Sequence, residues 1–282
     1  MQFSASRRKV AGVVATLLTA LTVVVAPFAP QANAQQANAV LFGDSVLADP
    51  TVPGWAAGKM GLDPRGSSNV ATWCPTSPTS FGKQAAAKLG LPAWDYSCTG
   101  TISISQGPKV GTQVDRALND GALTPSTRRV ILTTGFNDAY NTGNRTPDQA
   151  RAAYVSALTP QIDRIRQAAP NARIQIVGYP QITDGFGNVC LFHVGPNMFD
   201  RTPAPQVAGW ENLAQWMQVD LANATGVEFL DMKPSTRWNS MCAQDDKRMW
   251  AGLVDFYGGP GNLPIHVNQR GHAHVSEVIA RS

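Results

Sequence analysis

The sequence predicts an α/β fold, a three-layer flavodoxin-like parallel sheet with helices on both faces. Two observations support this prediction. Five short apolar or β-branched runs have the length of buried strands, and segments with apolar residues at helical spacing separate them. Strands that alternate with helices pair in parallel through crossover connections, and right-handed crossovers make the flavodoxin-like strand order the expected one.

The five expected strands cover residues 40–42, 94–98, 129–134, 173–178 and 226–231. The run at 129–134 is the strongest, because it is rich in β-branched residues and lies between turn residues. The first run ends at Gly43, whose missing Cβ lets the backbone turn sharply at the carboxyl end of the strand. We therefore expect a tight turn that presents Ser45 at an edge of the sheet.

Helical patterns separate these runs. We expect helices over residues 80–89 and 112–119, a long helix from Thr146, a helix with Trp210 and Met217 on its buried face, and a last helix that begins near Asn268. The long helix begins with a capping box of Thr146 and Gln149, and Pro160 is expected to kink it.

The segment that follows Ser45 contains two pairs of helix-breaking residues. Asp49-Pro50 and Pro53-Gly54 argue against a long regular helix there. We therefore expect an irregular loop beside Ser45.

The first 34 residues have the pattern of a signal peptide. Three basic residues at 7–9 precede an uncharged apolar run over residues 10–26, and Ala32-Asn33-Ala34 supplies the small residues that signal peptidase prefers. We expect cleavage after Ala34, with Ala39 as the second choice, and hence a secreted or cell-envelope-associated protein. Residues 35–282 then form a single domain, since no shift in composition marks a second one.

Charge and hydropathy exclude several classes of partner. The formal net charge of +4 includes the three basic residues at 7–9, so the mature chain is close to neutral. This balance argues against binding to nucleic acid or to a charged membrane surface. No second apolar run approaches the roughly 20 residues that a membrane helix requires. We expect a monomer.

Four cysteines, Cys74, Cys98, Cys190 and Cys242, remain after cleavage, and an exported chain lets them pair. Of the three connectivities, we favour Cys74–Cys98 with Cys190–Cys242, because each pair closes a local loop. Zinc binding is the competing interpretation. Neither a C-x-x-C motif nor a paired histidine spacing supports it, so we expect no metal site.

Four residues far apart in the sequence fall at comparable places in the expected fold. Ser45, Gly100 and Asn137 follow strands, and His266 precedes the last helix. The carboxyl ends of parallel strands are where open α/β sheets bind their ligands. A Gly-Asp-Ser tripeptide alone is more often an ordinary turn or helix cap, and only its combination with the other three residues favours a functional site.

These residues stand in four blocks, Gly43-Asp44-Ser45, Ser97-Cys98-Thr99-Gly100, Gly135-Phe136-Asn137-Asp138 and His266 before Gly271-His272. With these blocks in this order, the chain resembles the SGNH (GDSL-type) hydrolase superfamily, and its cysteine-containing loop resembles that of secreted actinobacterial esterases and lipases. The resemblance implies Ser45 as nucleophile and His266 as base. It also implies an oxyanion hole of the Ser45 and Gly100 backbone N–H groups and the Asn137 amide, with no cofactor.

The chemistry of ester cleavage explains these residue types. A serine hydroxyl is a poor nucleophile until a neighbouring imidazole takes its proton. Attack on the carbonyl creates an oxyanion, which fixed hydrogen-bond donors stabilise. We expect Asp138 to hold its loop rather than to take part in this chemistry, and His272 to be a packed histidine of the last helix.

The last block departs from the superfamily pattern. An aspartate usually stands three residues before the histidine and orients it, but Leu263 occupies that position here. Asp255 or Asp231 could fold in to replace it, or a backbone carbonyl could accept the Nδ1 proton. We favour the carbonyl and hence a Ser-His dyad.

The sequence therefore predicts a secreted serine ester hydrolase that works through an acyl-enzyme. Its partner is expected to be a small-molecule ester or an acyl or acetyl ester of a lipid or a cell-envelope glycan. Two alternatives stay open. One is a cell-envelope acyltransferase, because the acceptor of the acyl group is not visible in the sequence. The other is a non-catalytic lipid- or carbohydrate-binding module, for which the missing aspartate is the only support.

Overall fold

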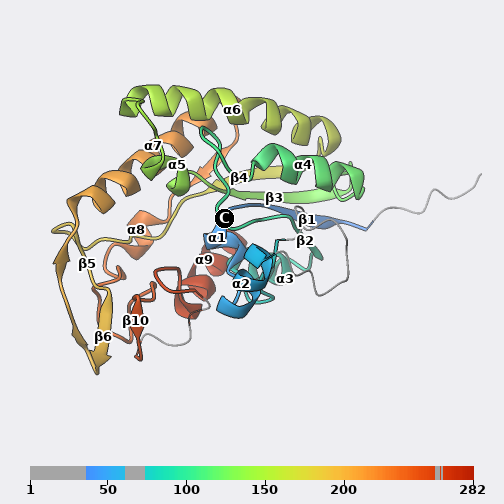
Figure 1. Ribbon diagram of the computed structural model, residues 1–282. Helices are drawn as coiled ribbons and strands as arrows, with labels where there is room; N and C mark the ends of the chain where they lie inside the picture. The colour runs from blue at the N-terminus through green and yellow to red at the C-terminus, as the bar shows by residue number, and fades with distance from the viewer. Residues whose placement is uncertain (1–35, 61–73, 258–260, 262) are drawn as a thin grey trace, which may run out of the picture. The chain divides into compact units, whose positions relative to one another are not determined.

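The central sheet carries five parallel strands in the part of the chain that the structure describes, residues 36–60, 74–257, 261 and 263–282 of a computed structural model. Their order is β2 (Ala93–Asp95), β1 (Asn38–Gly43), β3 (Thr127–Thr133), β4 (Arg173–Val177) and β9 (Glu228–Leu230) (Figure 1). This is the flavodoxin-like order, so the predicted fold class is confirmed. The expected signal peptide and its cleavage after Ala34 lie outside the described residues.

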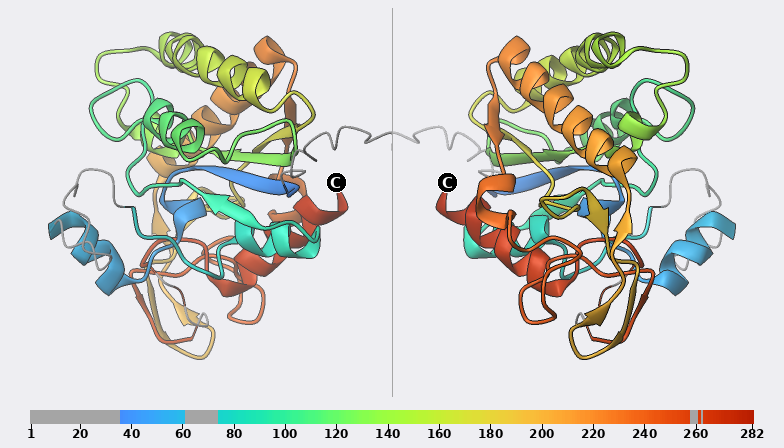
Figure 2. Two further views of the ribbon diagram at one scale, coloured as in Figure 1. Left: turned by 90° about the vertical axis from the view of Figure 1, so that its right-hand side faces the viewer. Right: turned by 90° about the vertical axis from the view of Figure 1, so that its left-hand side faces the viewer.

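Helices cover both faces of this sheet. Figure 2 shows the sheet edge-on between two helical layers. One layer contains α4 (Val110–Asn119), α6 (Pro147–Ala168) and α7 (Pro205–Thr225), and the other contains α3 (Phe81–Lys88) and α9 (Gln269–Arg281). All five helices were predicted, because each buries one apolar face against the sheet.

Strand register brings the predicted site residues to one edge. Gly43 of β1 lies opposite Thr133 of β3, so these two strands end at the same level. On the other side of β1, the Cys98 N–H donates to the Gly43 carbonyl at 2.9 Å. The turns that carry Ser45, Gly100 and Asn137 therefore leave the sheet side by side.

Capping explains where several helices begin. The Thr146 hydroxyl accepts from the Gln149 N–H, and the Gln149 side chain accepts from the Thr146 N–H, which is the predicted capping box. The helix continues through Pro160 to Ala168. Ser80 stands at the N-cap of α3, but its hydroxyl makes no capping bond there.

The segment after Ser45 differs from the expected loop. Two helices occupy it, α1 (Ser45–Ala48) and α2 (Val52–Met60). Pro53 and Gly54 lie in the first turn of α2, where a proline removes no helical hydrogen bond. The expectation of an irregular loop was wrong at this point.

Two small sheets and two short helices complete the fold. β5 (Asn188–Val189) pairs with β8 (Thr202–Pro203), and β6 (Phe192–Gly195) pairs with β7 (Met198–Phe199) and β10 (Val254–Asp255). The short helices are α5 (Phe136–Tyr140) and α8 (Lys233–Thr236). These strands were not predicted, because runs of two to four residues are too short to show a strand period.

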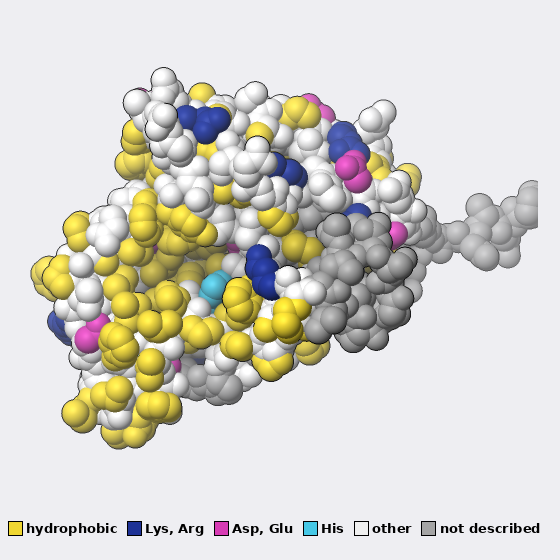
Figure 3. All heavy atoms as spheres, viewed as in Figure 1, with side chains coloured by type: hydrophobic (Ala, Val, Ile, Leu, Met, Phe, Trp, Pro, Cys, Tyr) yellow, Lys and Arg dark blue, Asp and Glu magenta, His cyan; other side chains and the backbone are white. Residues whose placement is uncertain are grey.

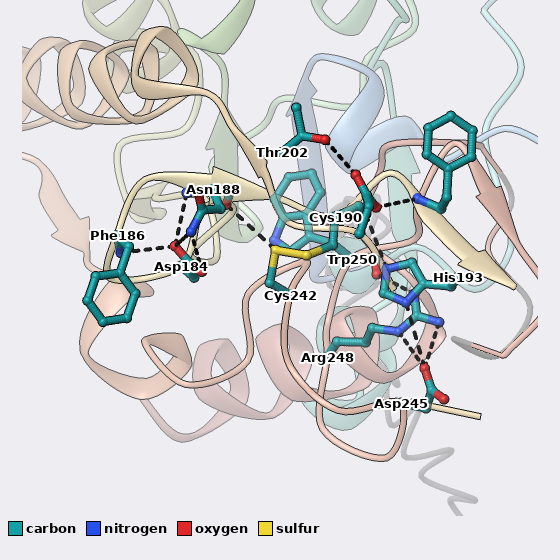
Figure 4. The surroundings of a disulfide bond; sticks show 12 residues. Asp184, Phe186, Asn188, Cys190, His193, Thr202, Cys242, Asp245, Arg248 and Trp250 are labelled. Carbon is teal, nitrogen blue, oxygen red and sulfur yellow. Dashed lines mark hydrogen bonds and ion pairs between the residues drawn. A yellow bond between two sulfur atoms is a disulfide. The ribbon is translucent and has the colours of Figure 1, made fainter. Parts of the chain in front are cut away.

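Two disulfides join loops around the sheet. Cys74 is bonded to Cys98 and Cys190 to Cys242, as predicted, and the Cα atoms of each pair are 5.0 Å apart. The first ties the segment before α3 to the turn that contains Gly100. The second ties the chain between β5 and β6 to the segment after α8 (Figure 4). Within the described residues, none of the helices combines the length and hydropathy of a membrane-spanning segment.

Candidate active site

Ser45 is the first residue of α1, directly after the turn that ends β1. A Cβ on Gly43 would lie 2.5 Å from the Thr133 carbonyl oxygen, so only glycine lets the strands approach this closely. The Asp44 carboxylate caps α1 by accepting from the Val46 N–H at 2.9 Å. Close strand packing and the cap together fix the orientation of Ser45.

The Asp44 carboxylate accepts a second hydrogen bond, from a tyrosine hydroxyl. Asp44 is buried, and its second oxygen accepts a hydrogen bond from the Tyr179 hydroxyl, which in turn accepts from the Phe136 N–H at 3.1 Å. Burial raises the pKa of Asp44 to about 7. Tyr179 thus connects the turn of Ser45 to the helix that carries Asn137. Nothing in the sequence pattern had indicated this link.

His266 lies within hydrogen-bonding distance of Ser45. Its Nε2 is 2.8 Å from the Ser45 Oγ, and its Nδ1 is 2.8 Å from the Pro264 carbonyl oxygen. A carbonyl only accepts, so Nδ1 carries the proton and Nε2 is left to accept from the serine hydroxyl. The chain therefore holds the imidazole in the tautomer that a general base requires.

The two acidic residues considered for orienting His266 have other partners. Asp255 pairs with Arg248, whose Nη2 is 2.7 Å from its Oδ1, and also accepts from the Gly252 N–H. Asp231 accepts from the Gln215 amide and the Lys233 N–H. In this structure the group bonded to His266 Nδ1 is the Pro264 carbonyl, and neither of these two carboxylates.

A strained residue shapes the loop that carries His266. Ile265 has φ +59, a left-handed conformation that is rare for a β-branched side chain and costs roughly 1–3 kcal/mol. It turns the chain so that the imidazole reaches the carbonyl two residues earlier. The Ile265 N–H donates to the Gly252 carbonyl at 3.1 Å, and the His266 carbonyl accepts from the Ala251 N–H at 2.8 Å. These bonds hold the strained turn in place.

Burial lowers the pKa of His266 from its ordinary value. The Pro264 carbonyl and the Asp49 carboxylate oppose this shift. The imidazole therefore stays neutral, and able to accept a proton, at a lower pH than an exposed histidine.

The residues expected to donate hydrogen bonds to an oxyanion lie beside Ser45 in the same cavity. The Tyr140 hydroxyl donates to Asn137 Oδ1 at 2.6 Å, which sets the orientation of this amide. Asn137 Nδ2 donates one proton to the Thr101 carbonyl at 2.9 Å, and its second proton remains available. Gly100 has φ +79, a conformation that suits glycine. Ser45, Gly100, Asn137 and His266 all line the same cavity.

The Asp138 side chain connects α5 to the segment that follows Gly100. Its Oδ1 accepts from the N–H groups of Ser103 and Ile104 at 2.6 and 2.8 Å. Burial raises the pKa of this carboxyl to about 6. Asp138 thus fixes the segment after Gly100 against α5, in line with the structural role expected for it.

Comparison with known proteins gives the family. Residues 41–274 match the GDSL-like Lipase/Acylhydrolase family. The chain belongs to this family. The GDSL-family chain is also 25% identical to Lipase 2 of Streptomyces coelicolor, over 94% of this chain and 92% of that protein. The predicted resemblance is therefore confirmed, and the protein is an ester hydrolase.

Solved structures show the same fold. Phospholipase A1 from Streptomyces albidoflavus superimposes with a TM-score of 0.56 at 16% identity, covering 87% of the GDSL-family chain and 98% of that enzyme. The extracellular lipase from Streptomyces rimosus gives a TM-score of 0.55 at 17% identity, with the same coverage. At this level of identity the comparison supports the fold alone.

The cavity of this GDSL-family hydrolase has a volume of about 620 Å³. Apolar side chains from the small sheets, from α5 and α7 and from the last loops form most of its lining, namely Phe136, Tyr140, Ile182, Val189, Leu191, Val207, Trp210, Met241, Trp250, Leu263 and Ile265. Figure 3 shows a hollow on this face edged by hydrophobic side chains. Sequence patterns gave little indication of this lining, because its residues come from separate segments spread between residues 136 and 265.

His272 packs between helices of the GDSL-family fold. Its Nδ1 accepts from the Phe81 N–H at 3.1 Å, and its Nε2 lies 3.1 Å from an Asp49 carboxylate oxygen. The side chain is buried and stacks on Phe81. It joins α9 to the start of α3 and the end of α1, as expected for a packed histidine.

Proposed function

We propose that this ester hydrolase forms an acyl-enzyme on Ser45, with His266 as the base and with the Pro264 carbonyl, rather than a carboxylate, bonded to the Nδ1 of that imidazole. The contact between His266 Nε2 and Ser45 Oγ at 2.8 Å, with Nδ1 directed at a carbonyl, is the observation that carries the proposal. It provides both a nucleophile and a base in the correct tautomer.

In the acylation step, His266 Nε2 takes the hydroxyl proton as Ser45 Oγ bonds to the ester carbonyl carbon. The carbonyl oxygen becomes an oxyanion, which accepts from the Ser45 and Gly100 N–H groups and the Asn137 amide. When the C–O bond to the alcohol breaks, the imidazolium gives its proton to the leaving oxygen. The Pro264 carbonyl accepts from Nδ1 throughout and keeps the ring in position.

In the deacylation step, a water molecule gives a proton to His266 and attacks the acyl carbon. The second tetrahedral intermediate uses the same donors. Its collapse returns the proton to Ser45 Oγ and releases the carboxylic acid. Each proton that leaves an attacking oxygen is thus returned to a leaving oxygen.

A fluorophosphonate probe tests the proposed nucleophile. It is expected to label the wild-type chain on the peptide that contains Ser45, as located by mass spectrometry. The labelling rate should rise with pH, because a protonated imidazole cannot accept the serine proton. Since burial lowers the pKa of His266, the midpoint should fall below about 6.5. An adduct on another residue, or a midpoint above that value, would contradict the proposal.

The lining of the cavity favours an apolar acyl group over acetyl. Its volume of about 620 Å³ lies within the range of small-molecule sites. With p-nitrophenyl esters from acetate to palmitate, kcat/KM is expected to rise about fourfold per methylene up to the length that fills the cavity, because each buried methylene contributes about 0.8 kcal/mol. Acetate as the best substrate of this series would favour an esterase for acetylated glycans instead.

We also propose that the enzyme is exported and cleaved after Ala34. The basic and apolar pattern over residues 7–26 supports export, and so do the two disulfides, which form in oxidising compartments. Mass spectrometry of protein from the culture medium should find Gln35 at the amino terminus. A mature chain that starts at Met1 inside the cell would contradict this proposal.

A further inference from the structure

The small sheet of β10, β6 and β7 reverses the usual distribution of side chains. In β6, His193 is fully buried, whereas Phe192 and Val194 on either side of it point outward and are about half exposed. A strand at a protein surface normally buries its apolar residues and exposes its polar ones. This sheet therefore presents its apolar face to solvent.

Buried polar side chains fix the sheet in this orientation. His193 lies 3.8 Å from an Asp245 carboxylate oxygen, and the fully buried Arg248 bonds the same carboxylate (Figure 4). Arg248 also bonds Asp255 of β10. Turning the sheet so that its apolar side packed against the protein would break the ion pairs of Arg248, and separating buried charges is costly. The outward apolar face is thus a fixed feature of the fold.

The apolar face continues beyond β6. The following side chains of the sheet and its flanks are also exposed: Met198 at 62%, Leu253 at 47%, Val254 at 37%, Phe256 at 74% and Tyr257 at 42%. We call this set, with Phe192 and Val194, the apolar apron. Contiguous exposed apolar surface of this kind marks an interaction site rather than ordinary protein surface.

Backbone hydrogen bonds connect segments of the apron to residues that line the cavity. The Leu191 carbonyl accepts from the N–H groups of Leu253 and Val254 at 2.7 and 3.0 Å, and Leu191 itself lines the cavity. Ile265, which also lines it, donates to the Gly252 carbonyl. Figure 3 shows hydrophobic side chains from the hollow down to the region that Figure 1 labels β6 and β10. One apolar surface therefore extends from the apron to the mouth of the cavity.

We propose that the apron docks this enzyme on the surface of aggregated lipid, so that an ester passes from the lipid into the cavity without crossing water. The proposal rests on the proposed function in one respect, namely that the cavity takes an apolar acyl group. A lipid surface supplies the substrate itself. A protein or a second copy seated on the apron would instead cover the apolar surface that leads to the cavity.

Binding to phosphatidylcholine vesicles tests the apron directly, by sedimentation of the protein with the vesicles. In the variant Phe192→Ser/Val194→Thr/Phe256→Ser, the partition coefficient is expected to fall at least about tenfold, since three apolar side chains lose their burial in lipid. The matched control Trp94→Ser/Trp216→Ser removes exposed apolar side chains from β2 and α7. It should bind like the wild type.

Hydrolysis of dissolved p-nitrophenyl butyrate separates docking from catalysis. None of the three apron residues lines the cavity, so kcat/KM for this soluble ester should stay within about twofold of wild type in both variants. Activity on tributyrin above its solubility limit should fall in the apron variant alone. If the wild type cleaves neither ester but binds vesicles, the proposed function fails and docking stands.

Three results would overturn the docking proposal. They are equal vesicle binding by the wild type and both variants, no vesicle binding by the wild type, and a wild-type dimer in sedimentation that the apron variant loses. The last result would assign the apron to self-association. If the triple variant unfolds at a lower temperature than the wild type, the single variant Val194→Thr, which keeps the shape of a β-branched residue, takes its place.

Discussion

Ser45→Ala is expected to lower kcat about a million-fold, and adding His266→Ala should lower it no further. The two side chains act as one unit, because the hydroxyl becomes a nucleophile only as the imidazole takes its proton across the 2.8 Å contact. Once either is removed, only the oxyanion donors and substrate binding remain. The measurement is kcat for a p-nitrophenyl ester in the two single variants and the double variant.

Two carboxylate variants serve as controls for this result. Asp231→Asn and Asp255→Asn should leave the acid limb of the pH profile where it is in the wild type, because both side chains bond elsewhere. Asp255→Asn is expected to lower thermal stability, since Arg248 is fully buried and loses part of its ion pairing. A displaced acid limb in either variant, with the fold intact, would show that a carboxylate orients His266 after all. For the Ser45 and His266 variants, a double variant whose loss of kcat equals the two single losses combined would mean that these residues act independently.

The strands of the central sheet could be predicted because parallel strands are buried on both faces. All six residues of β1 are buried, and Ala39 to Phe42 form an unbroken apolar run within it. The position of three site residues follows from the same rule, since turns that leave neighbouring parallel strands meet at one edge. Both predictions depend only on local pattern and on pairing rules.

The orientation of the site residues could not be predicted in the same way. It depends on contacts between distant segments, such as the Tyr179 hydroxyl on Asp44 and the Tyr140 hydroxyl on Asn137. It also depends on the left-handed turn at Ile265, because propensity rules favour glycine or asparagine there and never a β-branched residue. The backbone acceptor for His266 was one of several alternatives until this turn was known.

The apolar apron shows a further limit of pattern analysis. Alternation in β6 was too short to detect, and its apolar residues would have been assigned to the core. In the structure, the buried ion pairs of Arg248 help to hold the polar side chains of this sheet inward and its apolar side chains outward. Function that depends on reversed alternation therefore becomes visible only with the tertiary structure.

Asn137→Ala is expected to lower kcat roughly 100- to 1000-fold with little change in KM, because one donor to the oxyanion is lost and that donor acts mainly in the transition state. The Nδ2 group has the geometry for this role, since one of its protons is used on the Thr101 carbonyl and the other is available. Steady-state kinetics on the preferred p-nitrophenyl ester provide both parameters.

Tyr140→Phe separates the donor from its orientation. The Tyr140 hydroxyl donates to Asn137 Oδ1 at 2.6 Å and so prevents the amide from turning its oxygen toward the oxyanion. Without that hydroxyl the amide keeps its bond to Thr101 but loses one constraint, so kcat should fall only about tenfold. A loss as large as that of Asn137→Ala would mean that Tyr140 itself contacts the reacting carbonyl. No loss in either variant would leave the Ser45 and Gly100 N–H groups as sufficient donors, and the amide would then be part of the loop structure alone.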